Sequence, residues 1–258
     1  MKKKFKYVYG PVFSWRLGVS LGIDPISAEH KICSFNCTYC QLGETKVLSD
    51  ERKDFVSVSE IIEEIDLLPS LSADVITFSG RGEPTLAANL GQMLRAIKKI
   101  RKERLAVITN TSLISREDVR NDLSYADIVI AKLDAPSQKS FEVINQPIET
   151  VCFDALIQGI KNFRNIFKGK LALQVMFISK NKEYAEEIAR IAKEISPAEV
   201  QINTPLRPCK ERPLPKAELD ILKKHFEGLK SISVYDIEKK KVQPLSDKNT
   251  LERRGKAY

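Results

Sequence analysis

Short apolar runs alternate with amphipathic segments along most of this 258-residue chain. This alternation is typical of β-strand and α-helix units arranged around a parallel sheet. We expect strands near residues 19–26, 75–79, 105–109, 128–133, 171–178 and 199–203, and one further strand at 231–237. We expect helices at residues 58–68, 87–102, 116–123, 151–167, 183–195 and 216–226. The sequence therefore predicts a parallel α/β fold built from six strand–helix units.

The helix expected at residues 58–68 shows this pattern clearly. Ser57 or Ser59 can cap its first turn, and Pro69 would end it. One apolar face should cover the sheet because apolar residues recur every three or four positions. These residues are Val58, Ile61, Ile62, Ile65 and Leu68.

Length and composition limit the class of protein. A chain of this length can bury one large core but is short for two domains. Hydrophobic residues at 43% and charged residues at 29% exclude disordered and fibrous classes. The sequence contains no run of about 18 apolar residues, and its basic N-terminus lacks an apolar signal core. We therefore expect a cytoplasmic protein with no membrane partner.

Three of the five cysteines, Cys33, Cys37 and Cys40, form a C-x3-C-x2-C motif. Three thiolates at this spacing can hold three corners of one cubic iron–sulfur cluster and leave the fourth iron without a protein ligand. The alternative is a structural zinc site completed by His30. Zinc sites usually use paired C-x2-C elements from two segments, and no second pair is present. The spacing therefore favours an iron–sulfur cluster, with His30 at the surface.

The cysteine motif, with Tyr39 before its last cysteine, and the segment Ser79-Gly-Arg-Gly-Glu-Pro-Thr85 resemble the radical S-adenosylmethionine (SAM) superfamily. The opening segment 9–18 (YGPVFSWRLG) and the segment 40–43 (CQLG) are similar to a subgroup related to the wyosine-base synthases, which modify transfer RNA. The resemblance covers about residues 7 to 210. It implies a partial, TIM-like (β/α)6 barrel whose open side is closed by substrate or by extra elements.

This resemblance also implies a reaction and a domain plan. A reduced 4Fe-4S cluster on Cys33, Cys37 and Cys40 would donate one electron to SAM, giving methionine and a 5'-deoxyadenosyl radical that abstracts a substrate hydrogen. Flavodoxin or ferredoxin would supply the electron. We expect residues 1–18 to pack on the barrel, residues 19–228 to form the radical SAM core, and residues 229–258 to form a C-terminal extension or tail.

The expected cofactor-binding residues follow the strands. Tyr39 matches the position whose backbone contacts the SAM adenine, and Glu83 the carboxylate that accepts from the methionine ammonium group. The remaining candidates lie near strand ends, where such barrels build their sites, although Asn and Asp also favour turns and caps. The full set is Tyr39, Gly80, Gly82, Glu83, Asn110, Asp134, Gln174 and Asn203.

Two arginines are candidate substrate contacts. Arg16 belongs to the opening segment, in which Phe13 and Trp15 replace a proline and an arginine common in the subgroup, and Arg207 follows the sixth expected strand. Each could instead be a salt-bridged or solvated surface residue. Arg81 interrupts the usual Gly-Gly-Glu pattern, and its role is open.

The substrate divides the hypotheses. A net charge of +8 and the subgroup resemblance favour an anionic substrate, either transfer RNA or another anion. The wyosine-base synthases carry further cysteines for a second cluster, whereas this chain has only Cys152, expected to be buried, and Cys209, expected near the open face. That difference favours a small molecule or a peptide. A non-catalytic zinc or iron–sulfur binding module is the third hypothesis.

Overall fold

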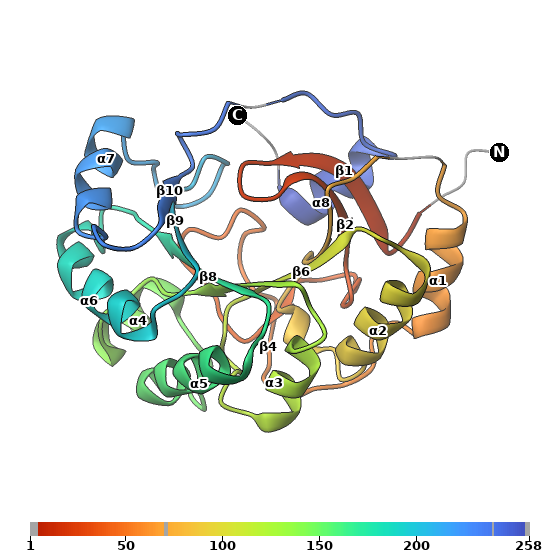
Figure 1. Cartoon of the computed structure of the whole chain (residues 1–258), viewed down its shortest axis with the longest axis horizontal. Helices are drawn as coiled ribbons and strands as arrows, with labels where there is room; N and C mark the ends of the chain where they lie inside the picture. The colour runs from red at the N-terminus through yellow and green to blue at the C-terminus, as the bar shows by residue number, and fades with distance from the viewer. Residues whose placement is uncertain (1–4, 70–71, 239, 256–258) are drawn as a thin grey trace.

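The computed structural model describes residues 5–69, 72–238 and 240–255 (Figure 1). It contains an eight-stranded sheet with the order β1-β2-β5-β6-β7-β8-β9-β10. Strand β1 runs antiparallel to β2, and all other neighbours are parallel. The strands are β1 Val8–Ser14, β2 Gly18–Ile23, β5 Val75–Phe78, β6 Arg104–Thr109, β7 Ile128–Lys132, β8 Lys170–Met176, β9 Glu199–Asn203 and β10 Ser231–Ser233. A separate pair is formed by β3 Ile32–Cys33 and β4 Val47–Leu48.

The sheet curls into a partial TIM-like barrel with helices along its outer side (Figure 1), which confirms the expected α/β fold. The six predicted helices are α1 Val58–Asp66, α2 Leu90–Ile100, α3 Glu117–Leu123, α5 Phe153–Ile166, α6 Ala185–Ile195 and α7 Lys216–Lys224. Two further helices, α4 Gln138–Asn145 and α8 Asp247–Arg254, were not predicted. Helix α2 begins later than expected because Pro84–Leu86 form a 3-10 turn, η1. A second such turn, η2 Lys182–Tyr184, precedes α6.

The start of α1 follows the expected capping pattern. Ser57 accepts a hydrogen bond from Glu60 N (3.2 Å), and the Glu60 carboxylate accepts one from Ser57 N (3.0 Å). This reciprocal capping box satisfies two donors that the first helical turn leaves open. The apolar face of the helix buries Ile61 and Ile65. The sequence alone therefore fixes both where α1 starts and which face it buries.

Successive residues of the strands pack alternately into two different apolar clusters. Ile76, Val107 and Val129 belong to the large apolar cluster that also contains the helix side chains. The neighbouring positions Val75, Ala106, Ile128, Ile130 and Ala172 form a second, smaller cluster closed by Leu17. Successive strand residues point to opposite faces. The second cluster therefore fills the inner, concave side of the curled sheet.

Both ends of the described chain join this barrel. The opening segment forms β1 and pairs with β2 in a hairpin. The region for which a C-terminal extension or tail was expected contributes β10 to the main sheet and then forms α8, which packs against β1 (Figure 1). Thr250 Oγ1 of α8 accepts a hydrogen bond from Gly10 N (3.2 Å). None of the described helices has both the length and the apolar character required to cross a lipid bilayer.

Candidate functional site

The cysteine motif lies in the long connection after the C-terminal end of β2. Cys33 is buried in β3, whereas Cys37 and Cys40 are half-buried. The parallel strands β5 to β9 run in the same direction as β2. The motif is therefore at the carboxyl edge of the sheet, where barrels of this type form their sites.

Helix α4, which the sequence analysis missed, holds this loop in place. Asn36 N donates to the backbone oxygen of Asn145 (3.1 Å), and Thr38 N donates to that of Ile144 (3.0 Å). These carbonyls belong to the last turn of α4 and have no partner within the helix. Phe35 adds an edge-on aromatic contact with Phe141 at a centroid distance of 5.1 Å. Helix α4 therefore holds the loop through both backbone hydrogen bonds and a side-chain contact.

Two asparagine amides lie against the thiols. Asn110 Nδ2 is 3.5 Å from Cys33 Sγ, and Asn145 Nδ2 is 3.6 Å from Cys37 Sγ. Burial raises the pKa of both thiols, that of Cys37 to about 11. These thiols would lose their protons on binding iron. Among the described residues, no three His, Cys, Asp or Glu side chains converge as the ligands of a single metal ion would.

The Glu83 carboxylate is buried and fully engaged by the chain itself. Its Oε1 accepts from Thr85 N (3.1 Å), Thr85 Oγ1 (2.7 Å) and Thr109 Oγ1 (2.6 Å). Its Oε2 accepts from Asn110 N (2.7 Å). Burial raises the pKa of Glu83, and these donors oppose that shift. The side chain therefore ties the turn after β5 to the end of β6, directly beside the thiols.

The glycines of the same turn allow close backbone packing. Glu83 N donates to Ile32 O (3.2 Å), and a Cβ atom on Gly82 would lie 1.7 Å from that oxygen. A Cβ atom on Gly80 would lie 2.3 Å from Asp24 Cγ. Only glycine leaves room for these approaches. The turn thus packs directly against the cysteine loop.

A second buried carboxylate lies on the other side of the loop. Asp134 accepts hydrogen bonds from the Tyr39 hydroxyl, from Asn145 Nδ2 (2.9 Å) and from Met176 N (2.7 Å). Lys132 Nζ is 3.3 Å from Asp134 and 4.7 Å from the centre of the Tyr39 ring. Burial is the main cause that raises the pKa of Tyr39, so the phenol remains a donor. Asn145 was not predicted, because it belongs to the unpredicted helix α4, although Ser137 offered a capping signal for that helix.

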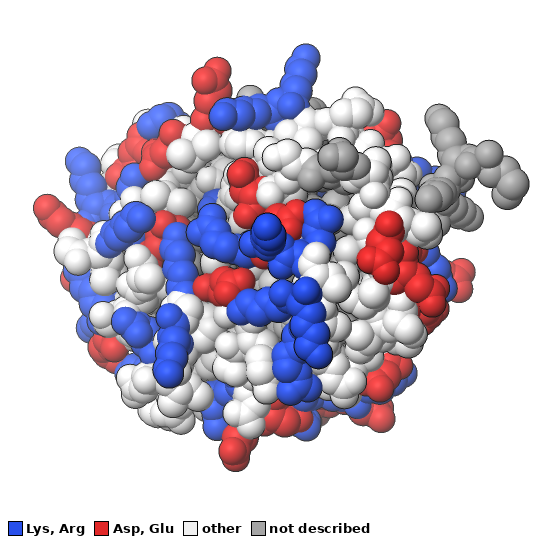
Figure 2. All heavy atoms as spheres, turned by 45° about the vertical axis from the view of Figure 1, so that its right-hand side comes forward, with Lys and Arg blue, Asp and Glu red and all other residues white. Residues whose placement is uncertain are grey.

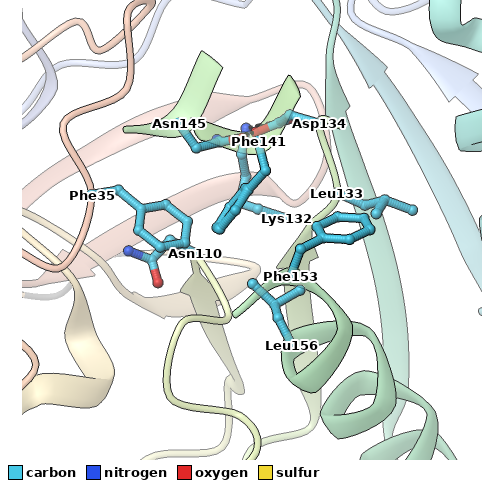
Figure 3. Close-up of a pocket in the computed structure, with 9 residues that line it drawn as sticks. All are labelled: Phe35, Asn110, Lys132, Leu133, Asp134, Phe141, Asn145, Phe153 and Leu156. Atoms are coloured by element: carbon cyan, nitrogen blue, oxygen red, sulfur yellow. Dashed lines mark hydrogen bonds and ion pairs between the residues drawn. The ribbon is translucent and has the colours of Figure 1, made fainter. Parts of the chain in front are cut away.

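Two cavities adjoin these groups. The smaller is shown in Figure 3 and lies between Asn110, Lys132, Asp134 and Asn145 on one side and apolar side chains such as Phe153 on the other. The larger has a volume of about 380 Å³, which is in the range of ligand sites. Its lining includes Cys37, Cys40, Gln41, Gln146, Cys209 and Lys210. Residues of the cysteine loop thus contribute to both a narrow crevice of mixed polarity, through Phe35, and a roomier cavity, through Cys37 and Cys40.

The remaining cofactor candidates lie deeper in the sheet. Gln174 is buried and stands between Lys132 and Gln201 in the strand register. Asn203 is buried at the end of β9, and its Oδ1 accepts from Thr204 N (2.9 Å). Asn203 thus has the local turn contact that its residue type favours, while Gln174 faces the inner side of the sheet.

The charged candidates have different surroundings. Arg81 Nη2 pairs with Glu252 of α8 at 2.8 Å, which gives this residue a structural contact. Arg207 Nη1 donates to the backbone oxygen of Gly255 (2.8 Å). Arg16 is half-buried, and its Nε and Nη1 atoms are buried without a hydrogen-bond partner among the described residues. Within the described residues, Arg16 therefore lacks the salt bridge considered from the sequence.

The other reactive residues are placed as follows. His30 is exposed, as expected. Cys152 is also exposed, so the expectation of a buried thiol was wrong. It is the N-cap of α5, and the apolar face of that helix begins only with Phe153 and Leu156. Cys209 is half-buried in the wall of the larger cavity, together with Cys40.

Comparison with known proteins agrees with this geometry. The chain is 43% identical over 209 residues to a UPF0026 protein of Synechocystis sp., covering 81% of this chain and 78% of that protein. It is 41% identical over 241 residues to a protein named GTPase Obg from Brachyspira hyodysenteriae, covering 90% of this chain but only 35% of that relative. It therefore spans about a third of that relative's length.

A similar fold is found in a structure described as TYW1 with a lysine-pyruvate adduct bound. The TM-score is 0.61 at 17% identity, covering 82% of this chain and 74% of that chain. The sequence pattern of the Radical SAM superfamily matches residues 30–192, which include all three motif cysteines and the turn around Glu83. This match extends over more than half of the chain, and membership of the superfamily implies a 4Fe-4S cluster and SAM. The chain belongs to the radical SAM superfamily.

Proposed function

We propose that this protein cleaves SAM reductively and uses the resulting radical to abstract a hydrogen atom from its substrate. The observation that carries this proposal is the single loop with Cys33, Cys37 and Cys40, fixed at the carboxyl edge of the sheet beside a cavity of about 380 Å³. When bound, a 4Fe-4S cluster and SAM would supply the 5'-deoxyadenosyl radical. The protein would position these groups and shield them from water.

The donor set fits such a cluster. Thiolate sulfurs are its usual ligands, and the three thiols would be provided by Cys33, Cys37 and Cys40. Amide N–H groups of Asn110 and Asn145 already point at two of the sulfurs. Hydrogen bonds to the charged form of a group favour that form. These amides would therefore stabilise thiolates in a site where burial opposes them.

The surrounding polar residues would bind SAM. Glu83 would hold the backbone of its own turn and of Asn110 in a fixed position, so that little reorganisation accompanies binding. Asp134 would orient the Tyr39 hydroxyl and Asn145 in the same way. We assign SAM contacts to Tyr39, Gly80, Gly82, Glu83, Asn110, Asp134, Gln174 and Asn203.

An anionic substrate, such as transfer RNA, is our first choice. Lys and Arg side chains gather across the middle of one face (Figure 2), and the net charge is +8. Such a surface attracts polyanions. A small molecule or a peptide is the second candidate, because only Cys152 and Cys209 are left for further metal ligation, and Cys152 is exposed. We also propose a cytoplasmic enzyme reduced by a flavodoxin- or ferredoxin-type donor.

The Cys40→Ala variant tests the cofactor. Anaerobically reconstituted wild-type protein should be brown, contain iron and sulfide, and form 5'-deoxyadenosine from SAM when reduced. The variant should lose all of these properties because one corner of the cluster has no ligand. Cys152→Ala is the matched control and should retain these properties, since the Cys152 thiol is exposed at the start of α5 and does not belong to the cysteine motif.

Two results would contradict the proposal. One is undiminished SAM cleavage by Cys40→Ala, and the other is colourless wild-type protein with one zinc per chain, as the binding-module hypothesis expects. The same assay with and without bulk transfer RNA addresses the substrate. A rate raised by RNA supports RNA modification, whereas an unchanged rate favours small molecules or peptides.

A further inference from the structure

Arg16 lacks the carboxylate partners that other buried arginines of the described chain have, and its guanidinium lies over the Trp15 ring at 5.1 Å from the ring centre. Arg52 pairs with Asp118 (2.7 Å) and with Asp122, and Arg253 lies 3.0 Å from Asp24. Buried cations are normally compensated in this way, because an unpaired charge away from water is costly. Arg16 breaks this rule, since its Nε and Nη1 atoms are buried without a partner among the described residues.

Arg16 lies in the turn of the β1–β2 hairpin, directly before Leu17. Its neighbour Leu17 packs in the inner cluster with Ile130 and Ala172. Two residues further along those strands, on the same face, stand Lys132 and Gln174, and the adjacent position on β9 is Gln201. The Gln201 side-chain oxygen is also buried without a partner in the described chain. The apolar inner cluster is therefore followed by a polar layer in which the Gln201 oxygen has no partner among the described residues.

Two more arginines lie at the end of α8. Arg207 Nη1 donates to the backbone oxygens of Arg254 (3.2 Å) and Gly255 (2.8 Å). A Cβ atom on Gly255 would lie 2.5 Å from the backbone oxygen of Gln41, the residue after Cys40. The end of α8 is therefore packed against the cysteine loop. Neither guanidinium has a carboxylate within salt-bridge distance among the residues that the structure describes.

The charge of Arg254 acts on the other two guanidinium groups. Burial lowers the pKa of Arg16 and that of Arg207 to about 10, and the charge of Arg254 adds to both shifts. Burial also lowers the pKa of Arg254. Like charges within mutual reach repel. A bound anion would offset this repulsion and accept hydrogen bonds from the Nε and Nη1 groups of Arg16.

We propose that Arg16, Arg207 and Arg254 bind a phosphate-type dianionic group of the substrate on the concave side of the barrel. Guanidinium groups match phosphate oxygens in charge and geometry, and three positive charges suit more than one negative charge. The site deepens the proposed function, on which its assignment to the substrate rests. It would hold the substrate between the polar layer of Lys132 and Gln201 and the cysteine loop.

The test measures binding of inorganic pyrophosphate to the full-length apoprotein by calorimetry, without iron or SAM. Wild-type protein should bind it, and Arg16→Gln and Arg254→Gln should each weaken binding at least tenfold. Lys193→Gln on the exposed side of α6 removes one charge elsewhere and should bind like wild type. Arg16→Gln should also keep a melting temperature close to that of wild type, because removal of a buried charge without a carboxylate partner offsets the loss of the contact with the Trp15 ring.

Three results would overturn this site: no pyrophosphate binding by wild type, unchanged binding by both arginine variants, or equal weakening by Lys193→Gln. Competition between SAM and pyrophosphate would instead assign the arginines to the cofactor and refute a substrate site. Since this assay needs no cluster, its failure leaves the proposed SAM chemistry intact. Failure of the Cys40→Ala test would in turn leave the measured anion binding intact.

Discussion

Glu83 is the residue on which the geometry of the site most depends. Its carboxylate accepts four hydrogen bonds, from Thr85, Thr109 and Asn110. It thereby connects the turn after β5 with the end of β6, where Asn110 also contacts Cys33. A carboxylate is needed because each partner is a donor. The Gly-Arg-Gly-Glu segment thus has a structural role in addition to the proposed contact with SAM.

Glu83→Gln should lower the stability of the apoprotein by about 2 kcal/mol, since the new NH2 group faces donors and a charged acceptor is lost. Urea unfolding at neutral pH measures the effect. Glu63→Gln serves as the control, because Glu63 is exposed on α1. Equal midpoints for the two variants would show that the buried network contributes nothing.

Helix α8 is the element whose position could least be anticipated. Arg253 Nε lies 3.0 Å from Asp24 Oδ2, although its N–H is not aligned on that oxygen, so the contact is an ion pair. Both side chains are almost fully buried. The pair of Arg81 with Glu252 is more exposed, at 21% and 35% of the side chains. The two contacts join α8 to the loop after β2 and to the turn before Glu83.

Asp24→Asn should cost about 3 kcal/mol, because it leaves the Arg253 charge buried and unpaired. Glu252→Gln should cost less than about 1 kcal/mol, since exposed pairs are screened by water. Urea unfolding gives both values, and hydrogen exchange should show faster exchange at residues 247–254 in Asp24→Asn only. Similar exchange of α8 in both variants would contradict an anchoring role for the buried pair.

At the scale of the whole molecule, one large apolar cluster, distinct from the smaller inner one, joins most of the described chain. It runs from Phe5 to Val234 and includes residues of the sheet and of helices α1 to α7. Trp15, the only tryptophan of the sequence, packs against it at the β1–β2 hairpin. A large continuous cluster of this kind favours a single cooperative transition. We therefore treat the opening segment and the barrel core as one unit.

Tryptophan fluorescence and far-ultraviolet circular dichroism should accordingly give the same urea midpoint. Fluorescence reports the hairpin that carries Trp15, whereas dichroism reports the helices of the whole barrel. Two separate midpoints would mean that the opening segment unfolds on its own. The Trp15→Phe variant is a control. Its urea midpoint, measured by dichroism, should equal that of the wild type if Trp15 reports unfolding without altering it.

The sequence by itself determined the features that depend on local patterns. Alternating apolar segments predict the six strand–helix units, because burial of one face imposes a period on neighbouring residues. Ser57 and Glu60 define the start of α1 for the same local reason. The spacing of Cys33, Cys37 and Cys40 identifies the cysteine loop. Each of these features can be predicted from residues that are close together in the sequence.

Only the tertiary structure decided which distant residues meet. Helix α8 is too polar for an apolar periodicity, and it is held by pairs such as Arg253 with Asp24, whose sequence separation leaves no local signal. Asn145 reaches Cys37 because α4 packs on the cysteine loop. The same holds for Arg254, whose charge lowers the pKa of Arg16 although the two residues are far apart in the sequence. Contacts across the barrel arise from packing of the whole chain, and therefore the charge arrangement of the site became visible only in three dimensions.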